Sequence, residues 1–290
     1  MTYRQILVEG ENILKDAEID DYKSDAWLLF EYAFGMNRTG YLVKADKEVE
    51  GVISEYLDII NERATRKPLQ HITGVQEFYG LEFIVNENVL IPRQDTEILV
   101  EEAIKIINNP DCKDTGCHIL DMCTGSGCIA ITLAKNCENT KVTGVDISDG
   151  ALEVAVANKE KNSAANVDFI QSNLFENIND KFDVIVSNPP YIESDVIDTL
   201  MQEVKDFEPR LALDGEADGL KFYREITKQS LKYMKPSGYL LYEIGHNQGE
   251  AVSNIMIENG YTAVKVIKDL AGLDRVVMGH FPEEMEEDNV

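Results

Sequence analysis

The sequence predicts an α/β protein with a doubly wound, mostly parallel sheet of seven strands, preceded by a small helical bundle. Three observations predict this fold. Strand-like apolar runs alternate with helical patterns over residues 93–282. A glycine-rich stretch at residues 123–127 directly follows one of those runs. Apolar side chains over residues 3–67 recur at three- and four-residue spacing, which is typical of packed helices.

These patterns divide the chain into four segments. Residues 1–73 are expected to form a helical domain. Residues 74–92 change to a two-residue period and predict a β-hairpin linker. Residues 93–282 are expected to form the α/β domain. The acidic residues 283–290 predict a disordered tail without a function of its own.

The α/β domain is predicted in detail from periodicity and from its glycines. The expected helices lie at residues 96–107, 126–136, 151–162, 220–234 and 248–259. The expected strands lie at residues 118–122, 141–145, 167–170, 182–187, 239–244, 262–267 and 275–279. Because no helix separates the last two strands, which flank Gly272, we expect them to pair as an antiparallel hairpin at the sheet edge.

A nucleoside site is predicted at the glycine-rich stretch. Its residues Cys123, Thr124, Gly125, Ser126 and Gly127 come between the apolar run ending at Met122 and a helix. About twenty residues past the loop, the next strand ends at Asp146, where a carboxylate can bind ribose hydroxyls. The loop sequence also satisfies the dinucleotide fingerprint, so by itself it does not distinguish NAD from other nucleoside cofactors.

The sequence Asn188-Pro189-Pro190-Tyr191 follows the fourth strand of the domain. Two prolines fix the backbone and remove two donors, which leaves carbonyl oxygens facing the space beyond the sheet. The Asn188 side chain adds an acceptor, and the Tyr191 ring adds a flat wall. The stretch is therefore suited to bind a planar –NH2 group, either an amide or the exocyclic amine of a base. A dehydrogenase has no need of it, which favours S-adenosylmethionine as the cofactor.

With these motifs, the chain resembles the class I methyltransferases, and more closely the family of glutamine-N5 methyltransferases that act on peptide chain release factors. The resemblance covers nearly the whole chain. The matching stretches are residues 91–97 (IPRQDTE), 121–130 (DMCTGSGCIA), 182–191 (FDVIVSNPPY), 207–213 (FEPRLAL), 243–248 (EIGHNQ) and 269–275 (DLAGLDR). The sequence departs from the family pattern at Gln94, where proline is usual, at Cys123, often glycine, and at Asn173, usually an acid. Asn173 faces the adenine amino group in such folds, and its amide oxygen can still accept a hydrogen bond.

The resemblance implies an enzyme that uses S-adenosylmethionine, releases S-adenosylhomocysteine and methylates the glutamine of a Gly-Gly-Gln loop. The implied partners are release factors, which the helical domain and the hairpin would dock. The implied cofactor-binding residues are Asp121, Cys123, Thr124, Gly125, Ser126, Gly127, Asp146, Ile147, Asn173, Leu174 and Asn188.

The glutamine amide nitrogen is a poor nucleophile because its lone pair is delocalised, whereas a sulfonium methyl group needs no activation. The enzyme is therefore expected to act on the nitrogen. We expect the Asn188 side-chain oxygen and the Pro189 carbonyl to accept the two amide hydrogens and to align the nitrogen for in-line attack. The residues expected to be catalytic are Asn188, Pro189 and Tyr191, and those expected to bind substrate are Asn188, Pro189, Pro190, Tyr191, Arg93 and Phe78. Asp95 and Glu97 could line the substrate mouth or cap the following helix, and capping is the preferred interpretation.

Composition limits the other possibilities. A net charge of −26 argues against direct nucleic-acid binding, although methylation of a base amine stays the alternative activity. A nucleotide-binding module without activity is the third hypothesis. Neither a membrane span nor a signal peptide is evident, so a soluble, cytoplasmic protein is expected. No metal is expected, because the five cysteines (Cys112, Cys117, Cys123, Cys128, Cys137) lack paired metal-ligand spacing.

Overall fold

The computed structural model describes residues 1–51, 53–109 and 116–282. These residues form two compact units. The helical unit contains Met1–Val75 together with Met201–Phe207, and the sheet unit contains the described residues of Gln76–Leu200 and those from Glu208 onward. The division into four segments stays a prediction, and the predicted tail and Cys112 lie outside the described residues.

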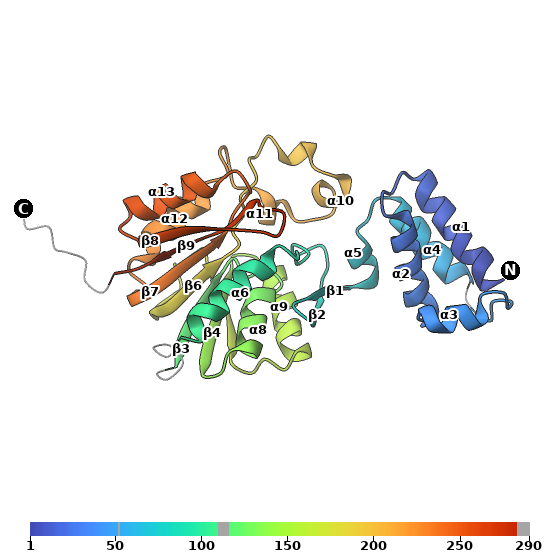
Figure 1. Cartoon of the computed structure of the whole chain (residues 1–290), viewed down its shortest axis with the longest axis horizontal. Helices are drawn as coiled ribbons and strands as arrows, with labels where there is room; N and C mark the ends of the chain where they lie inside the picture. The colour runs from blue at the N-terminus through green and yellow to red at the C-terminus, as the bar shows by residue number, and fades with distance from the viewer. Residues whose placement is uncertain (52, 110–115, 283–290) are drawn as a thin grey trace, which may run out of the picture. The chain divides into compact units, whose positions relative to one another are not determined.

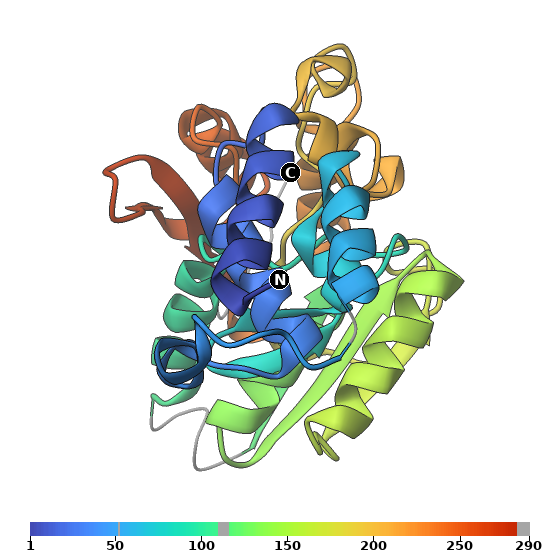
Figure 2. The same ribbon diagram turned by 90° about the vertical axis from the view of Figure 1, so that its right-hand side faces the viewer.

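The helical unit is built around an aromatic core. Its helices are α1 (Tyr3–Asp16), α2 (Tyr22–Phe34), α3 (Arg38–Lys44), α4 (Ile53–Ala64) and α5 (Leu69–Thr73). Figures 1 and 2 show α1, α2 and α4 side by side, as their mutual contacts require. Phe30 is fully buried between Tyr3, Trp27 and Tyr56 of these helices. The three- and four-residue apolar spacing therefore comes from packing within this bundle, as the sequence predicts.

A short segment from the second half of the chain completes the helical unit. It contains α10 (Gln202–Lys205), and Glu203 accepts hydrogen bonds from the Arg63 guanidinium at 3.3 Å. Arg63 is buried, and it also pairs with Asp25 at 2.7 Å. A buried arginine between two carboxylates is held strongly because removing any one of the three leaves an unpaired buried charge. The chain after the Asn188–Tyr191 stretch is thus anchored in the helical unit before it returns to the sheet unit at Glu208.

The sheet unit contains the predicted seven-stranded sheet (Figure 1). Its strands are β3 (Cys117–Met122), β4 (Thr140–Asp146), β5 (Val167–Gln171), β6 (Phe182–Ser187), β7 (Met234–Glu243), β8 (Thr262–Lys268) and β9 (Asp274–His280). The spatial order is β5-β4-β3-β6-β7-β9-β8, and the pairs from β5 to β7 are parallel. The predicted antiparallel edge hairpin is confirmed, with β8 at the edge and β9 against β7.

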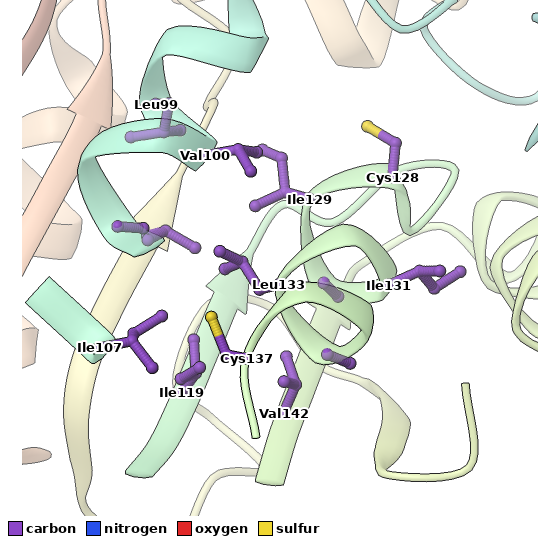
Figure 3. Packing of buried hydrophobic residues seen from close by; sticks show 14 of the residues in the cluster. Leu99, Val100, Ile107, Ile119, Cys128, Ile129, Ile131, Leu133, Cys137 and Val142 are labelled. Carbon is purple, nitrogen blue, oxygen red and sulfur yellow. The ribbon is translucent and has the colours of Figure 1, made fainter. Parts of the chain in front are cut away.

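Helices cover both faces of this sheet (Figure 1). One face packs against α6 (Thr96–Ile107), α8 (Cys128–Asn136) and α9 (Asp149–Lys161), and the other against α12 (Lys221–Ser230) and α13 (Gly249–Glu258). Alternate strand residues feed two separate cores, so that Val184 and Val186 face one core while Ile185 faces the other. Figure 3 shows Val100 of α6 and Ile129 of α8 pointing toward each other in the core between the sheet and these two helices.

Two details differ from the predicted elements. The predicted helix at residues 220–234 is wrong at its end, because α12 stops at Ser230 and Met234 pairs with Phe182 as the first residue of β7. The β-hairpin covers only the first part of the predicted linker, residues 74–92, because its strands are β1 (Val75–Phe78) and β2 (Leu81–Ile84). Among the described residues, no helix is long and apolar enough to cross a membrane.

Candidate active site

A cavity of about 690 Å³ lies in the sheet unit at the carboxyl ends of β3, β4, β5 and β6. Parallel sheets of this kind bind ligands at this edge, and the volume falls within the roughly 300–1,000 Å³ usual for small-molecule sites. The predicted site residues that line the cavity are Arg93, Cys123, Thr124, Gly125, Ser126, Asp146, Ile147, Asn173, Leu174, Asn188 and Pro190. The sequence motifs therefore meet in one place.

The glycine-rich loop forms the first wall of this cavity. Gly125 has a φ of +54° and Gly127 a φ of +78°, and a side chain at Gly127 would lie 2.9 Å from Phe169. Gly127 is the N-cap residue of α8, and glycines at such a turn let the loop backbone approach a ligand closely. Asp121 does not line the cavity but holds the loop, because its carboxylate accepts hydrogen bonds from the Thr124 hydroxyl at 2.5 Å and the Ala130 amide at 3.1 Å. Complete burial raises the pKa of Asp121 to about 7.

Asp146 forms the second wall, at the end of β4. Its carboxylate accepts hydrogen bonds from the Gly125 amide at 2.9 Å and from the Ser148 amide at 3.0 Å. Burial raises the pKa of Asp146, and the hydrogen bonds to these backbone amides oppose that rise. Each carboxylate oxygen keeps a second lone pair, so Asp146 can accept further hydrogen bonds from a ligand's hydroxyl groups.

Asn173 and Leu174 line the cavity at the end of β5. The Asn173 amide nitrogen donates to the Glu176 carboxylate at 2.9 Å, so the amide oxygen is left to accept from a ligand. Leu174 has a φ of +48°, an uncommon backbone conformation for a leucine. Ile147 lies nearby with an exposed side chain. An acceptor between two apolar side chains suits an adenine ring that carries an amino group.

The Asn188–Tyr191 stretch forms the wall at the end of β6, and we call it the platform. Asn188 and Pro190 line the cavity, whereas Pro189 and Tyr191 are not among its lining residues. The Ser187 hydroxyl donates to the Met122 carbonyl at 2.6 Å, which ties the platform to the strand that precedes the glycine-rich loop. Tyr191 is half-buried, and burial raises the pKa of its phenol.

Two ion pairs hold the residues before α6. Arg93 pairs with Glu208 at 2.6 Å, and the Glu208 carboxylate is almost completely buried. Asp95 occupies the N-cap position of α6, but its side chain makes no capping hydrogen bond and instead pairs with Arg275 at 3.0 Å. Glu97 accepts a hydrogen bond from the Tyr79 amide of the hairpin at 2.8 Å. The side chains of Asp95 and Glu97 therefore bind other segments of the chain at the start of α6.

Phe78 lies apart from the other predicted substrate residues. It is 1% exposed and packs edge-to-face on Phe83 in the core beside α6 and α8. Aromatic side chains in a hairpin can serve either packing or binding, and here the hydrophobic effect places the ring in the core. Among the described residues, no group of three or more histidine, cysteine, aspartate or glutamate side chains could hold a metal ion.

Comparison with known proteins explains this set of motifs. Residues 96–217 match the model of the methyltransferase small domain, and residues 5–74 match the PrmC N-terminal domain. The release factor glutamine methyltransferase of Clostridium acetobutylicum is 39% identical over 96% of this chain and 98% of its own length. The chain belongs to the release factor glutamine methyltransferase family. It is therefore a methyltransferase.

Two further similarities concern a second relative and the fold. The release factor glutamine methyltransferase of Fusobacterium nucleatum is 46% identical over 78% of this chain, which spans 65% of that protein. A methyltransferase structure from Pyrococcus furiosus is similar in fold, with a TM-score of 0.52, 17% identity, and coverage of 80% of this chain and 100% of that one.

Three side chains that hold this methyltransferase site were not predicted as site residues. Glu208 holds Arg93, Glu243 lies behind Asn188, and the Gln248 amide donates to the Tyr191 carbonyl at 3.0 Å. The signal was present, because all three lie in stretches that match the family. Their partners are distant in sequence, so their roles could be assigned only once the fold was known.

We expect Gly219→Ala to abolish most methyl transfer. Gly219 has a φ of +66°, and a Cβ atom there would lie 2.4 Å from the Tyr191 carbonyl oxygen and 2.7 Å from the Gln248 amide nitrogen. The backbone of the platform would have to move, and misplacement by about 1 Å can cost about a hundredfold in rate. The rate of methyl transfer at saturating cofactor measures this.

Gly35→Ala is the matched control for that variant. Gly35 has a φ of +58°, but a Cβ atom there meets nothing within 4 Å, so it adds backbone strain without a collision. If the two variants lose activity equally, measured at equal folded fraction, the collision of the Gly219→Ala side chain with the platform is not the cause of the loss.

Proposed function

We propose that this chain transfers a methyl group from S-adenosylmethionine to the side-chain amide nitrogen of the glutamine in the Gly-Gly-Gln motif of peptide chain release factors. The observation that carries the proposal is the position of Asn188, which lines the cavity shared by the glycine-rich loop and Asp146. An acceptor at that place can bind the –NH2 group of an amide. The names of the relatives specify which amide.

The residues of the cavity fit S-adenosylmethionine. The glycine-rich loop allows close approach of the backbone, Asp146 can accept from ribose hydroxyls, and the Asn173 oxygen can accept from the adenine amino group. When bound, the cofactor supplies a methyl group on a sulfonium, which needs no activation by the protein. The chain's own residues are therefore expected to work on the nitrogen.

In the proposed mechanism, the platform binds the two hydrogens of the amide. The Asn188 side-chain oxygen accepts one and the Pro189 carbonyl accepts the other, which holds the nitrogen about 3–3.5 Å from the carbon it attacks. As the new bond forms, the nitrogen becomes positively charged, so these acceptors bind the transition state more tightly than the ground state. The N-methylated amide then loses a proton to water. Tyr191 and Pro190 would border the amide plane, and Arg93 would lie at the mouth of the cavity.

The proposed partners follow from the same family. The helical unit would dock the release factor, in the cytoplasm where translation terminates. The net charge of −26 is unfavourable for nucleic acid and suits a neutral or basic protein partner. Methylation of a base amine, which the same platform chemistry would allow, is therefore the outcome that the test has to exclude.

The test is a methyl-transfer assay with methyl-labelled S-adenosylmethionine. The acceptors are an intact release factor, the same factor with the Gly-Gly-Gln glutamine changed to alanine, DNA and RNA. We expect label on the intact factor alone, with mass spectrometry placing one methyl group on that glutamine. Label on nucleic acid, or equal label on both forms of the factor, would overturn the proposal.

A further inference from the structure

Glu243 is a buried carboxylate behind the platform. It ends β7 and is 2% exposed, and it is not among the residues that line the cavity. Its neighbours Thr96 and Asn188 do line the cavity. An effect of Glu243 on the reaction is therefore expected to act through those side chains.

Three side chains form a connected set at this point. The Asn188 amide nitrogen donates to the Thr96 hydroxyl oxygen at 3.4 Å. Asn188 directly follows Ser187, which pairs with Tyr242 next to Glu243, so Asn188 and Glu243 lie at neighbouring strand ends. Burial raises the pKa of the Glu243 carboxyl, and hydrogen bonding from Thr96 and Asn188 lowers it. Thr96 is 2% exposed, so water does not compete for this contact. One carboxylate oxygen of Glu243, Oε2, has no hydrogen-bond partner among the described residues.

The chemistry of these groups fixes the orientation of Asn188. An ionised carboxylate only accepts hydrogen bonds, whereas a hydroxyl can donate or accept. An ionised Glu243 therefore favours the orientation in which the Asn188 –NH2 group faces Glu243 and Thr96, and this orientation leaves the amide oxygen to accept from a ligand. Thr96 alone would bind either end of the amide. If Asn188 turned over, it would present donors to a substrate nitrogen that needs acceptors.

We infer that Glu243 is a positioning residue, which orients the Asn188 amide so that its oxygen faces the nitrogen to be methylated. The inference rests on the proposed function, because it assigns the part of Asn188 that meets the substrate. It adds a residue that neither touches the substrate nor contacts the cavity.

A purely structural role for Glu243 makes a different prediction. Burial raises the pKa of Glu243 to about 7, while hydrogen bonds from Thr96 and the charge of Arg275 lower it. The carboxylate form is thus costly for the fold, and a neutral amide of the same shape should not destabilise it. If Glu243 positions Asn188, the same replacement lowers the rate even though the fold is no less stable.

The decisive variant is Glu243→Gln, assayed with a release factor at about pH 8.5. A glutamine can offer either its oxygen or its –NH2 group to Asn188, so it no longer imposes one orientation. We expect kcat to fall about tenfold, with the KM for S-adenosylmethionine within about twofold of wild type and an unfolding temperature that is not lower. An unchanged kcat would overturn the inference.

A double-mutant cycle with Asn188→Ala separates positioning from packing. If Glu243 acts through Asn188, adding Glu243→Gln to Asn188→Ala should change the residual single-turnover rate by less than about twofold. An equal tenfold loss in both backgrounds would assign Glu243 a role independent of Asn188.

The pH dependence of kcat is an independent readout. The titratable and charged groups that face Glu243 are Asp95 before α6, Cys128 in α8, Tyr191 after β6, Tyr223 in α12 and Arg275 in β9. As the pH falls through about 7, Glu243 gains a proton and can donate to the Asn188 oxygen, which turns that oxygen away from the substrate. Wild-type kcat should therefore fall below about pH 7, and this decrease should be absent in Glu243→Gln. The same decrease in both proteins would contradict the inference.

These experiments distinguish failure of the inference from failure of the proposed function. If the wild type labels the release factor and Asn188→Ala does not, the proposed function stands, whatever Glu243→Gln does. If Glu243→Gln then matches the wild type, only the positioning role is lost.

Discussion

Asn188→Ala is expected to lower kcat for release factor methylation by about 10²–10³-fold. Loss of one preorganised hydrogen-bonding group aimed at the reacting atoms typically costs this much. Asn188 lies at the end of β6 and lines the cavity, so alanine removes the acceptor while leaving the prolines of the platform in place. Single-turnover rates at saturating S-adenosylmethionine measure the effect on the chemical step.

Cofactor affinity has to be measured on the same variant, because the sequence also predicted Asn188 as a cofactor-binding residue. We expect the Kd for S-adenosylhomocysteine to rise less than about tenfold, since Asp146 and the glycine-rich loop are unchanged. If Kd rises as much as kcat falls, Asn188 holds the cofactor rather than the amide.

Asn179→Ala is the matched control for Asn188→Ala. Asn179 is an exposed asparagine of the same unit that does not line the cavity. The same chemical change there should leave kcat and Kd within about twofold, since surface substitutions away from special features have small effects. If the kcat of Asn188→Ala is also within about twofold of wild type, Asn188 does not have the central role that the proposed mechanism gives it.

Local sequence patterns predicted the elements of the sheet unit closely. The helix expected at residues 96–107 coincides with α6, and the strand expected at 182–187 coincides with β6. Polar residues, glycine or proline stand at the ends of these elements. The residues that mark each end are therefore within a few positions of it in the sequence. The chain between Tyr191 and Leu220 was not predicted, because its helices α10 and α11 (Arg210–Leu213) have four residues each and too little periodicity.

The order of the last two strands was also left open by the prediction of an edge hairpin. Val276 and Val277 of β9 are both fully buried, whereas β8 has no buried residue. A strand covered on both faces is apolar at successive positions. The adjacent valines of β9 thus carried a signal that β9, and not β8, pairs with β7.

The side chains that support the site depend on contacts between distant parts of the sequence. Asp95 pairs with Arg275, and Arg93 pairs with Glu208. Nothing near Asp95 in the sequence distinguishes a helix cap from an ion pair with a residue in the last strand. Phe78 shows the same limit, because an aromatic residue in a hairpin can line a channel or fill a core, and the tertiary structure decides.

Asp146→Ala is expected to weaken cofactor binding by about a hundredfold. Asp146 can accept from the ribose hydroxyls, and it already holds the Gly125 and Ser148 amides at 2.9 Å and 3.0 Å. Hydrogen bonds to a charged group contribute about 1.5–3 kcal/mol, and about 3 kcal/mol corresponds to roughly a hundredfold in Kd. Calorimetric titration with S-adenosylhomocysteine measures this directly.

The comparison with Asp149→Ala separates a direct contact between Asp146 and the cofactor from the effect of net charge on the Kd. Asp149 is an exposed aspartate at the start of α9 that does not line the cavity, so its removal changes the net charge equally. We expect its Kd to stay within about twofold of wild type. If both variants lose affinity equally, long-range charge accounts for the effect and Asp146 does not bind the ribose. If only Asp146→Ala loses affinity, and Asp146→Asn falls between it and the wild type, the carboxylate acts by direct contact, because an asparagine keeps one of the two acceptor oxygens.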